Sequence, residues 1–567
     1  MKDKIRFLAL GGLDADNKNL YIVEINDDIF IVSCGLGYPD KSTPGIDFVI
    51  PDISYLRENK HKVRAYIFQD CHDSTLFGLP FIYEEIPAPI YMTAFSKEIF
   101  QTFVDTLAIK DKLKFDIHLI DPNGEIKVAG RKISFFEIPH SNPFTFGIAI
   151  DTTEGNIIFS GDFIIEYNKT PGFRFNMNKL TEIVNDKNTF VLLGDSTNAG
   201  RKGFTSPSHR SEHIIRKGLN DSEGRIYIAV YSQNIYSFCE TIQACVESGR
   251  YIHLYDQETE NFYKILEKYG VTKVPASKLI SVDDLSRYSD KDVSIIMAGT
   301  GELLYNKISM LALKDIKEKR LYIKETDTFI LNCPAAANFE VLSVGVLDEL
   351  YKCDCKVIRA TRKTVARIHP SEDDLKFFIS IAKPKYYIPI KGQYKDLIHN
   401  ATIASDMNIG LNHTSIFLID NGFAVDFKDD KVTINSVEFE NDKVRIGPIL
   451  VDGTGIGDVA NEIISERNRL AEDGVIVMSV LVSLSEKEII GGPDVQMRGY
   501  LYLKESEQIL KKIQVLFVDI VNKNLKDEVL PFDEERCLKE IKDQCTKFTK
   551  KSTLRTPLIE PHLLIIK

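Results

Sequence analysis

Short runs of apolar residues alternate with turn-forming residues through the first 200 positions of the chain. The runs LYIVEI (20–25) and IFIVSC (29–34) are separated by three polar residues, and FGIAID (146–151) and IIFSGD (157–162) are separated by a segment that contains Gly155. Two apolar runs joined by so short a link are typical of a β-hairpin. The pattern therefore predicts two hairpins, one near each end of this region.

A buried strand is predicted between the hairpins. The segment RAYIFQD (64–70) has an apolar centre and leads through CHDST (71–75) into the helix-like segment FGLPFIYEEI (77–86). Proteins of the α/β class place chemically active side chains in such strand–loop–helix connections. We therefore expect functional residues at positions 70–75.

The pattern changes near Phe204. From about 206 to 362, strands such as GRIYIAVYS (224–232) alternate with helical segments such as ETIQACVESG (240–249), which predicts a parallel sheet in a separate α/β unit. Afterwards, DLKFFISIAKPKYYIPIKGQY (374–394) returns to the earlier style. The middle unit is therefore predicted to be an insertion into the first domain.

A small α+β domain is predicted at the end of the chain. It contains the strand GVIVMSVLVSL (474–484) and a helix with apolar residues spaced four, three and four apart from Ile509 to Ile520. The predicted domains are 1–205 and 363–446, which together form one split domain, 206–362, which is inserted into it, and 447–567.

Composition limits the class of protein. The 567 residues are 44% hydrophobic and 27% charged, which predicts several globular domains, and no apolar run long enough for a membrane span or a secretory signal is present. The nine cysteines form no CxxC pair, so we expect reduced, mostly buried thiols and a cytoplasmic protein without structural zinc. The net charge of -11 means that any RNA contact requires a local basic groove.

Several segments together resemble the RNase J family nearly from end to end. These segments are IDFVIPDISYLRENKHKVRAYIF (46–68), PHSNPFTFGIAI (139–150), SGDF (160–163), LLGDSTNA (192–199), AKPKYYIPIKGQY (382–394), VDGTGIGDV (451–459), RLAEDG (469–474) and GGPDVQMRGY (491–500). The resemblance implies an α/β fold: a metallo-β-lactamase αββα sandwich with an inserted β-CASP α/β domain and a small C-terminal α+β domain associated with dimer assembly. It also implies a role in rRNA maturation and mRNA turnover, because members of the family are 5'-to-3' exoribonucleases and endoribonucleases.

The resemblance implies a two-metal site whose ligands are largely replaced in this chain. The family motif HxHxDH falls on residues 70–75, where His72 is unchanged, and the later ligands His140 and Asp162 also match. Neutral hydroxyls are poor ligands and a lysine ammonium has no lone pair to donate. The degenerate positions are Ser33, Ser74, Thr75 and Lys391.

Two interpretations of the remaining pocket stay open. Asp70, His72, His140 and Asp162 provide two nitrogens and two carboxylates, a sufficient ligand set for a single Zn or Mn ion at most. Alternatively, Lys391 neutralises the carboxylates and the pocket is metal-free, which is the interpretation that we favour. Outside a metal site, His140 would be an ordinary hydrogen-bonded histidine.

The family's RNA-contacting segments are also partly changed. VYSQNIY (230–236) keeps Asn234 and contains Ser232, whereas VARIH (365–369) keeps His369 and gains Arg367. A guanidinium binds phosphate through two donors, so we expect Ser232, Asn234, Arg367 and His369 to contact RNA. Capping of the following helix is an equally good explanation for Asn234.

Three functions follow from these observations. The first is a weakly active or non-catalytic subunit that binds RNA and pairs with an active RNase J paralogue, or forms a homodimer. The second is an active ribonuclease that uses a single remaining metal position. The third is a stand-alone RNA-binding protein without membrane association.

Overall fold

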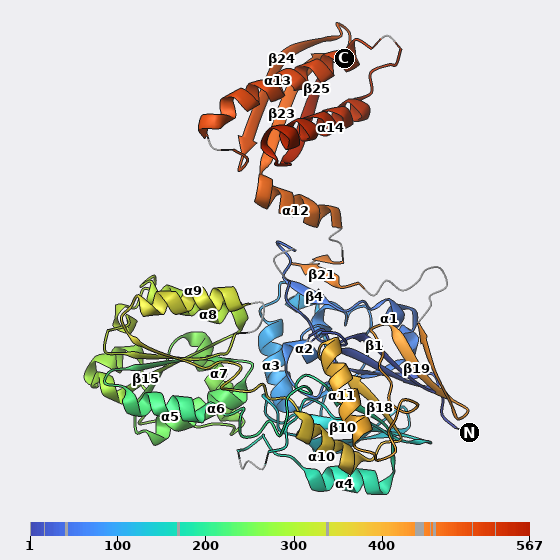
Figure 1. Cartoon of the computed structure of the whole chain (residues 1–567), viewed down its shortest axis with the longest axis vertical. Helices are drawn as coiled ribbons and strands as arrows, with labels where there is room; N and C mark the ends of the chain where they lie inside the picture. Colours follow the sequence, from blue (N-terminus) through green and yellow to red (C-terminus); the bar gives the residue numbers. More distant parts are fainter. Residues whose placement is uncertain are drawn as a thin grey trace. The chain divides into compact units, whose positions relative to one another are not determined.

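The structure is a computed structural model (Figure 1). It describes residues 2–15, 17–39, 43–166, 170–335, 339–436, 447–453, 455–457, 461–501, 503–527 and 529–566. The chain forms two compact units: unit one comprises Met1–Gly37 and Val49–Ile449, and unit two comprises Tyr38–Phe48 and Leu450–Lys567. Within the described ranges, no helix is long and apolar enough to span a membrane.

Unit one is built on two β-sheets that share one hydrophobic core, which includes Phe7 and Phe30 of the first sheet and Phe135 and Ile148 of the second. The first sheet has the order β20 (Lys431–Ser436), β19 (Phe423–Lys428), β1 (Ile5–Gly11), β2 (Leu20–Ile25), β3 (Asp28–Val32), β5 (Val63–Ile67), β6 (Ile90–Met92) and β7 (Ile117–Leu119). The second has the order β18 (Tyr386–Ile390), β12 (Thr189–Asp195), β11 (Gly155–Phe159), β10 (Phe146–Thr152), β9 (Arg131–Glu137) and β8 (Glu125–Val128). Since β2–β3 and β10–β11 are antiparallel neighbours, both predicted hairpins are confirmed.

Helices lie on the outer faces of this sandwich. On the second sheet, Leu180 and Phe378 pack against Phe136. On the first, the Tyr55 hydroxyl donates to Glu24 of β2 at 2.6 Å, on the strand face opposite to the shared core. The helices of the sandwich are α1 (Ser54–Glu58), α2 (Asp73–Leu76), α3 (Ala94–Val104), α4 (Met177–Asp186), α10 (Glu372–Ala382) and α11 (Tyr394–Asp406). This arrangement confirms the predicted αββα fold class.

The helix expected over 77–86 is wrong. Only the single 3-10 turn Leu79–Phe81 forms there, and the following residues continue as turns. Pro80 lacks a backbone N–H and Gly78 precedes it, so the segment is a poor helix former despite its apolar content. Gly78 also approaches the carbonyl of Gly35 too closely for a β-carbon, because an added Cβ would lie 2.5 Å from that oxygen.

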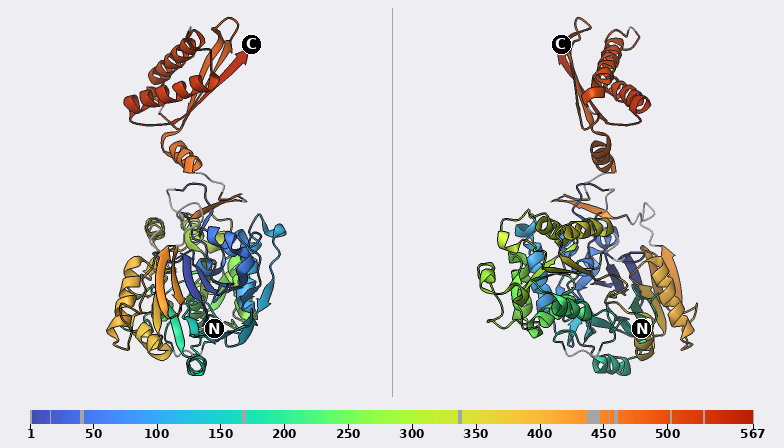
Figure 2. Two further views of the ribbon diagram at one scale, coloured as in Figure 1. Left: turned by 90° about the vertical axis from the view of Figure 1, so that its right-hand side faces the viewer. Right: turned by 60° about the vertical axis from the view of Figure 1, so that its left-hand side comes forward.

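A third sheet lies in the connection between β12 and β18, which are parallel neighbours in the second sheet (Figures 1 and 2). Its strands are all parallel, in the order β14 (Tyr251–Leu254), β15 (Val293–Gly299), β13 (Ile226–Tyr231), β16 (Thr328–Asn332) and β17 (Lys356–Arg359). Its helices are α5 (Glu212–Asp221), α6 (Ile235–Glu247), α7 (Gln257–Lys268), α8 (Gly301–Ala312) and α9 (Glu340–Tyr351). The topology agrees with an inserted unit, whereas its limits at 206 and 362 stay predictions.

Unit two is a three-stranded sheet with helices on one face. Ile513 and Ile520 of its longest helix are buried in its core, and Ile509 and Leu516 are partly buried against that core, which confirms the predicted helix face. Its main elements are α12 (Asn461–Asp473), β23 (Val475–Ser483), β24 (Glu488–Arg498), α13 (Leu503–Leu525), α14 (Glu534–Thr553) and β25 (Leu558–Ile566). Short strands near the limits of the units are β4 (Phe48–Ile50), β21 (Ile449–Asp452) and β22 (Gly455–Ile456).

The nine cysteines are all free, and eight of them are buried, as expected for reduced thiols. In the segment VDGTGIGDV, Thr454 and residues 458 and 459 lie outside the described residues.

A buried ion pair anchors the inserted sheet and gives a test of its packing. Arg225 Nη2 lies 2.7 Å from Asp327 Oδ2, and their side chains are only 4% and 0% exposed. We expect Asp327→Ala to lower the free energy of unfolding, measured by urea denaturation, by about 3–5 kcal/mol, because it leaves a buried guanidinium without its paired carboxylate. The control Asp348→Ala removes an exposed i,i+4 partner of Lys352 and should cost far less. Equal losses in the two variants would contradict this account.

Candidate functional site

The predicted site residues converge from loops that follow strands of both sheets. Asp70 and His72 follow β5, His140 follows β9, Asp162 follows β11 and Lys391 follows β18. Asp162 and Lys391 are 229 positions apart in the sequence and are nevertheless in direct contact. The pocket therefore exists only because the two sheets of the sandwich pack together.

Lys391 and Asp162 form a buried ion pair. The Nζ atom of Lys391 contacts Oδ2 of Asp162, and the two side chains are 6% and 9% exposed. Burial opposes the charge on Lys391, but the carboxylates of Asp162, Asp195 and Asp70 outweigh it and hold the pKa of Lys391 above its ordinary value. Burial likewise opposes the charge on Asp162, and the Lys391 ammonium outweighs it and lowers the pKa of that carboxyl. Both groups are therefore charged at neutral pH.

The backbone aims the Lys391 side chain. Lys391 and Ser33, two of the four degenerate positions, have φ values of 58° and 68°, in the left-handed region that most residues with a side chain avoid. Such a conformation costs roughly 1–3 kcal/mol and persists where the surroundings hold it. At Lys391 the surroundings do so, because its N–H donates to the Gly12 carbonyl at 3.0 Å and the next residue, Gly392, exchanges two backbone hydrogen bonds with Ala15.

The space beside this ion pair is small. A cavity of about 20 Å³ is lined by Tyr21, Asp70, Asp162 and three of the degenerate positions, Ser33, Thr75 and Lys391. A volume of this size holds about one water molecule. The fourth degenerate position, Ser74, does not line it, and its N–H donates to Asp73 Oδ1 at 2.7 Å.

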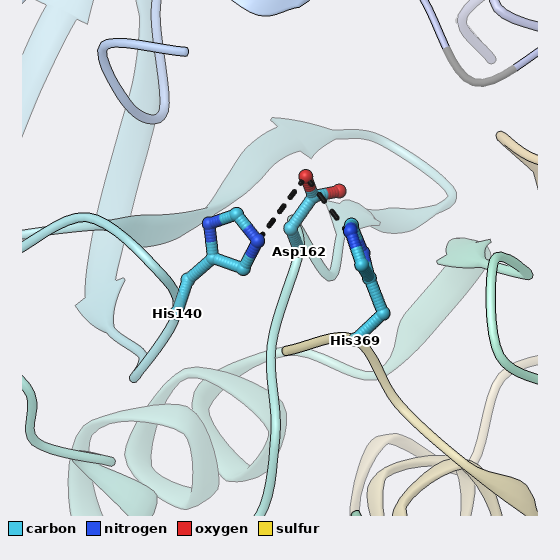
Figure 3. A group of neighbouring side chains, drawn as sticks. All are labelled: His140, Asp162 and His369. Carbon is cyan, nitrogen blue, oxygen red and sulfur yellow. Dashed lines mark ion pairs between the residues drawn. The ribbon is translucent and has the colours of Figure 1, made fainter. Parts of the chain in front are cut away.

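Three side chains gather at the same carboxylate. His140, Asp162 and His369 each offer one ligand atom, and these atoms lie within 4.8 Å of one another (Figure 3). The Nε2 atom of His140 is 3.7 Å from Asp162 Oδ2, and Nδ1 of His369 is 4.0 Å from the same oxygen. Burial lowers the pKa of His140 well below its ordinary value, so its ring is neutral. It therefore offers a lone pair toward Asp162 without adding positive charge.

The predicted four-residue ligand set is only partly brought together. His140 and Asp162 belong to the cluster, whereas Asp70 accepts from the His72 backbone N–H at 2.8 Å and the His72 ring lies 3.0 Å from Asp73. His369, which we expected to contact RNA, joins the cluster instead. The roles of all five residues as ligands or RNA contacts stay predictions.

Sequence reasoning assigned no role to three neighbours of the site. Asp195 Oδ2 lies 2.7 Å from His369 Nδ1, and Asp73 is hydrogen-bonded by Gln233 from the inserted unit as well as by His72. Asp195 had a detectable signal, since it is an acidic residue at the end of the buried strand β12. Asp73 and Gln233 had none, because their meeting depends on how the inserted unit packs against the sandwich.

The residues present do not fit a two-metal centre. Two ions 3.5–4 Å apart need several histidine and carboxylate ligands. Here two hydroxyls and an ammonium stand at three ligand positions, and the ammonium contacts the oxygen on which the neighbouring donors converge. A single ion held by His140, Asp162 and His369 would have to displace Lys391 from that oxygen.

The expected RNA contacts lie on neighbouring loops. The Asn234 side chain accepts from the Ser237 N–H at 3.1 Å and caps α6, which confirms the capping explanation for this residue. Ser232 follows β13, and its N–H donates to Gly299 at 2.9 Å. Asn198 donates to the carbonyls of Arg367 and His369, so it ties the loop 196–205 to the loop 361–371. The cationic side chains of these two loops are Arg201, Lys202, Arg362, Lys363 and Arg367.

Comparison with known proteins adds an independent finding. Residues 223–340 match the family model for "Ribonuclease J, beta-CASP domain", and residues 462–565 match the model for "Ribonuclease J C-terminal domain". The chain is 30% identical over 557 residues to Ribonuclease J 2 of Staphylococcus aureus (strain MRSA252), which covers 98% of this chain and 97% of that protein. It is 29% identical, with the same coverage, to Ribonuclease J 2 of Staphylococcus epidermidis (strain RP62A).

Among solved structures, the fold resembles that of a protein of unknown function from Enterococcus faecalis V583. The TM-score is 0.51 at 15% sequence identity, and the match covers 75% of this chain and 100% of the other. This similarity concerns the fold alone.

Removal of the ammonium tests the electrostatics of the pocket. We expect Lys391→Met to lower the free energy of unfolding by about 3–5 kcal/mol at neutral pH, because it leaves the buried Asp162 carboxylate unpaired. The exposed Lys395→Met, on α11, is the control. Since Lys391 lowers the pKa of Asp162, the stability from this pair is present above the unfolded-state pKa of about 4 and is lost as the pH falls through the folded-state pKa. The difference between wild type and variant in denaturation experiments should therefore shrink in acid, and a constant difference would contradict this interpretation.

Proposed function

The chain belongs to the ribonuclease J family, and from this premise we propose that it acts in RNA processing and decay as a non-catalytic or weakly active subunit. In this role it pairs with an active member of the family. The observation that supports this most directly is the contact between the Lys391 ammonium and the Asp162 carboxylate. Hydrolysis by two metal ions needs a pair of cations that hold the attacking and leaving oxygens, and a fixed ammonium on Asp162 activates no water.

The proposed ligand is RNA, including ribosomal and messenger precursors. The chain is acidic overall, so binding depends on a local concentration of positive charge. The two tied loops supply it, because five lysine and arginine residues lie within two short segments near His369. We place the protein in the cytoplasm, since nine free thiols suit a reducing compartment.

A second candidate is a ribonuclease that binds one Zn or Mn ion. The cluster of His140, Asp162 and His369 supports it, with His369 in place of the originally expected Asp70 and His72. Elemental analysis of the purified protein separates the two candidates. The first requires no bound ion at Asp162, whereas the second requires a stoichiometric ion that is lost in His140→Ala.

Catalysis and assembly are tested in one pair of experiments. With 5'-monophosphorylated RNA and Mn, we expect the pure protein to degrade no more RNA than the Asp162→Ala variant, because the residual rate of both would come from contamination. From native cells, we expect a tagged copy to bring down an active ribonuclease J. Cleavage that depends on Asp162 would favour the second candidate, and recovery without any bound nuclease would contradict the subunit role.

RNA affinity tests the cationic loops. A phosphate contact by Arg367 predicts that Arg367→Ala weakens binding of unrelated RNA sequences equally and lowers the slope of log affinity against log salt by about one. The control Arg287→Ala removes an exposed arginine of the inserted unit that is paired with Asp284. Binding is measured by fluorescence anisotropy at several salt concentrations, and an unchanged slope for Arg367→Ala would exclude this contact.

A further inference from the structure

One face of the inserted unit exposes large apolar side chains on two neighbouring helices. They are between 47% and 78% exposed, although isolated apolar residues of this size are usually covered when they cluster. The six residues of this α8–α9 face are Leu303, Met310 and Leu313 on or directly after α8, and Val341, Val344 and Tyr351 on α9.

The spacing of these residues is the same on both helices. Positions 303, 306, 310 and 313 and positions 341, 344, 348 and 351 each follow the pattern i, i+3, i+7, i+10, and each stripe contains one polar residue, Asn306 or Asp348. This is the spacing with which a helix contacts other helices side by side. The two stripes therefore have the geometry of a helix-packing surface.

The two stripes form one surface. The helices are parallel and adjacent, because a β-carbon on Gly301, at the start of α8, would lie 3.0 Å from the ring of Phe339, which precedes α9. At the other end, the Cys353 thiol lies 3.4 Å from the carbonyl of Ala312. Figure 1 shows α8 and α9 together on one face of the five-stranded sheet.

The inward faces of the same helices already supply the core. Leu304, Ile308 and Leu311 of α8 and Val346 and Leu350 of α9 are fully or almost fully buried against the sheet. The outward stripes are therefore not needed to hold the helices in place. A helix that is apolar on its outward side as well is typical of one with a second packing partner.

The charges at the ends of this face identify that partner. Glu302 and Glu340 lie at the N-terminal ends of the two helices, and Lys314 and Lys352 lie at the C-terminal ends. In a copy related by a two-fold axis the helices run antiparallel, so the acidic end of each copy meets the basic end of the other. Lys352 pairs with Asp348 in the free chain, but both are exposed, so this pair is easily exchanged.

We propose that the α8–α9 face binds the same face of a second copy of this chain in an antiparallel four-helix contact. Six apolar side chains per copy make a small interface, so association depends on concentration. The contact is independent of the metal pocket. It is also compatible with a different protein bound elsewhere on the molecule.

Charge reversal tests the antiparallel arrangement. In sedimentation equilibrium of the full chain, we expect wild type to double its particle mass as concentration rises. Glu302→Lys with Glu340→Lys, and separately Lys314→Glu with Lys352→Glu, should each shift the midpoint to at least tenfold higher concentration, since like charges then meet at both ends. An equimolar mixture of the two double variants should associate as wild type does, because each end again pairs opposite charges. A mixture that associates no better than the separate variants would overturn the proposed geometry.

Apolar substitution tests the surface itself. Met310→Glu with Val344→Glu should abolish the doubling. The control, Leu119→Glu with Ile398→Glu, changes two exposed apolar residues elsewhere on unit one and should leave the doubling intact. Circular dichroism checks that each variant is folded. Association of the α8–α9 variant at wild-type concentrations, or a wild type whose mass never doubles, would overturn the proposal.

Discussion

The structure of the pocket depends on the buried contact between Lys391 and Asp162. Three carboxylates, Asp70, Asp162 and Asp195, lie in or beside a cavity of about 20 Å³, and such a concentration of buried negative charge requires a positive charge nearby. In a two-metal enzyme, ions supply it. Here the ammonium does so from within the chain, and the backbone of Lys391 is held in a left-handed conformation that directs the side chain to Asp162. The pocket is therefore neutralised by folding alone.

The surrounding residues are consistent with that substitution. His140 is neutral because of its burial, and His369 is hydrogen-bonded to Asp195, so neither histidine is needed to balance Asp162. Gln233 reaches Asp73 from the inserted unit, so the two lobes of unit one meet in hydrogen bonds at the pocket. An active-site scaffold is thus retained with its ligand chemistry exchanged for an internal ion pair, while the basic loops beside it remain suited to phosphate.

Local patterns predicted most of the fold, because hairpins, a parallel sheet and an amphipathic helix leave periodic signals in the sequence. The segment 77–86 failed, since its apolar content indicated a helix that Pro80 and Gly78 prevent. The site was less predictable. Motif matching located Asp162, His140 and Lys391, but the approach of His369 to Asp162 and the hydrogen bond from Gln233 depend on contacts between segments far apart in sequence. No local pattern encodes such contacts. The outward stripes of α8 and α9 were likewise hidden, because a helix that is apolar all round does not tell which side the core uses.

The central claim is that the Lys391 ammonium takes the place of a cation at Asp162. Anomalous diffraction at the zinc edge, from crystals of the full chain soaked in zinc, measures this directly. The account predicts no anomalous peak within coordination distance of Asp162 Oδ2 and an ammonium that remains in contact with that oxygen. A fully occupied peak between His140, Asp162 and His369, with Lys391 turned away, would contradict it.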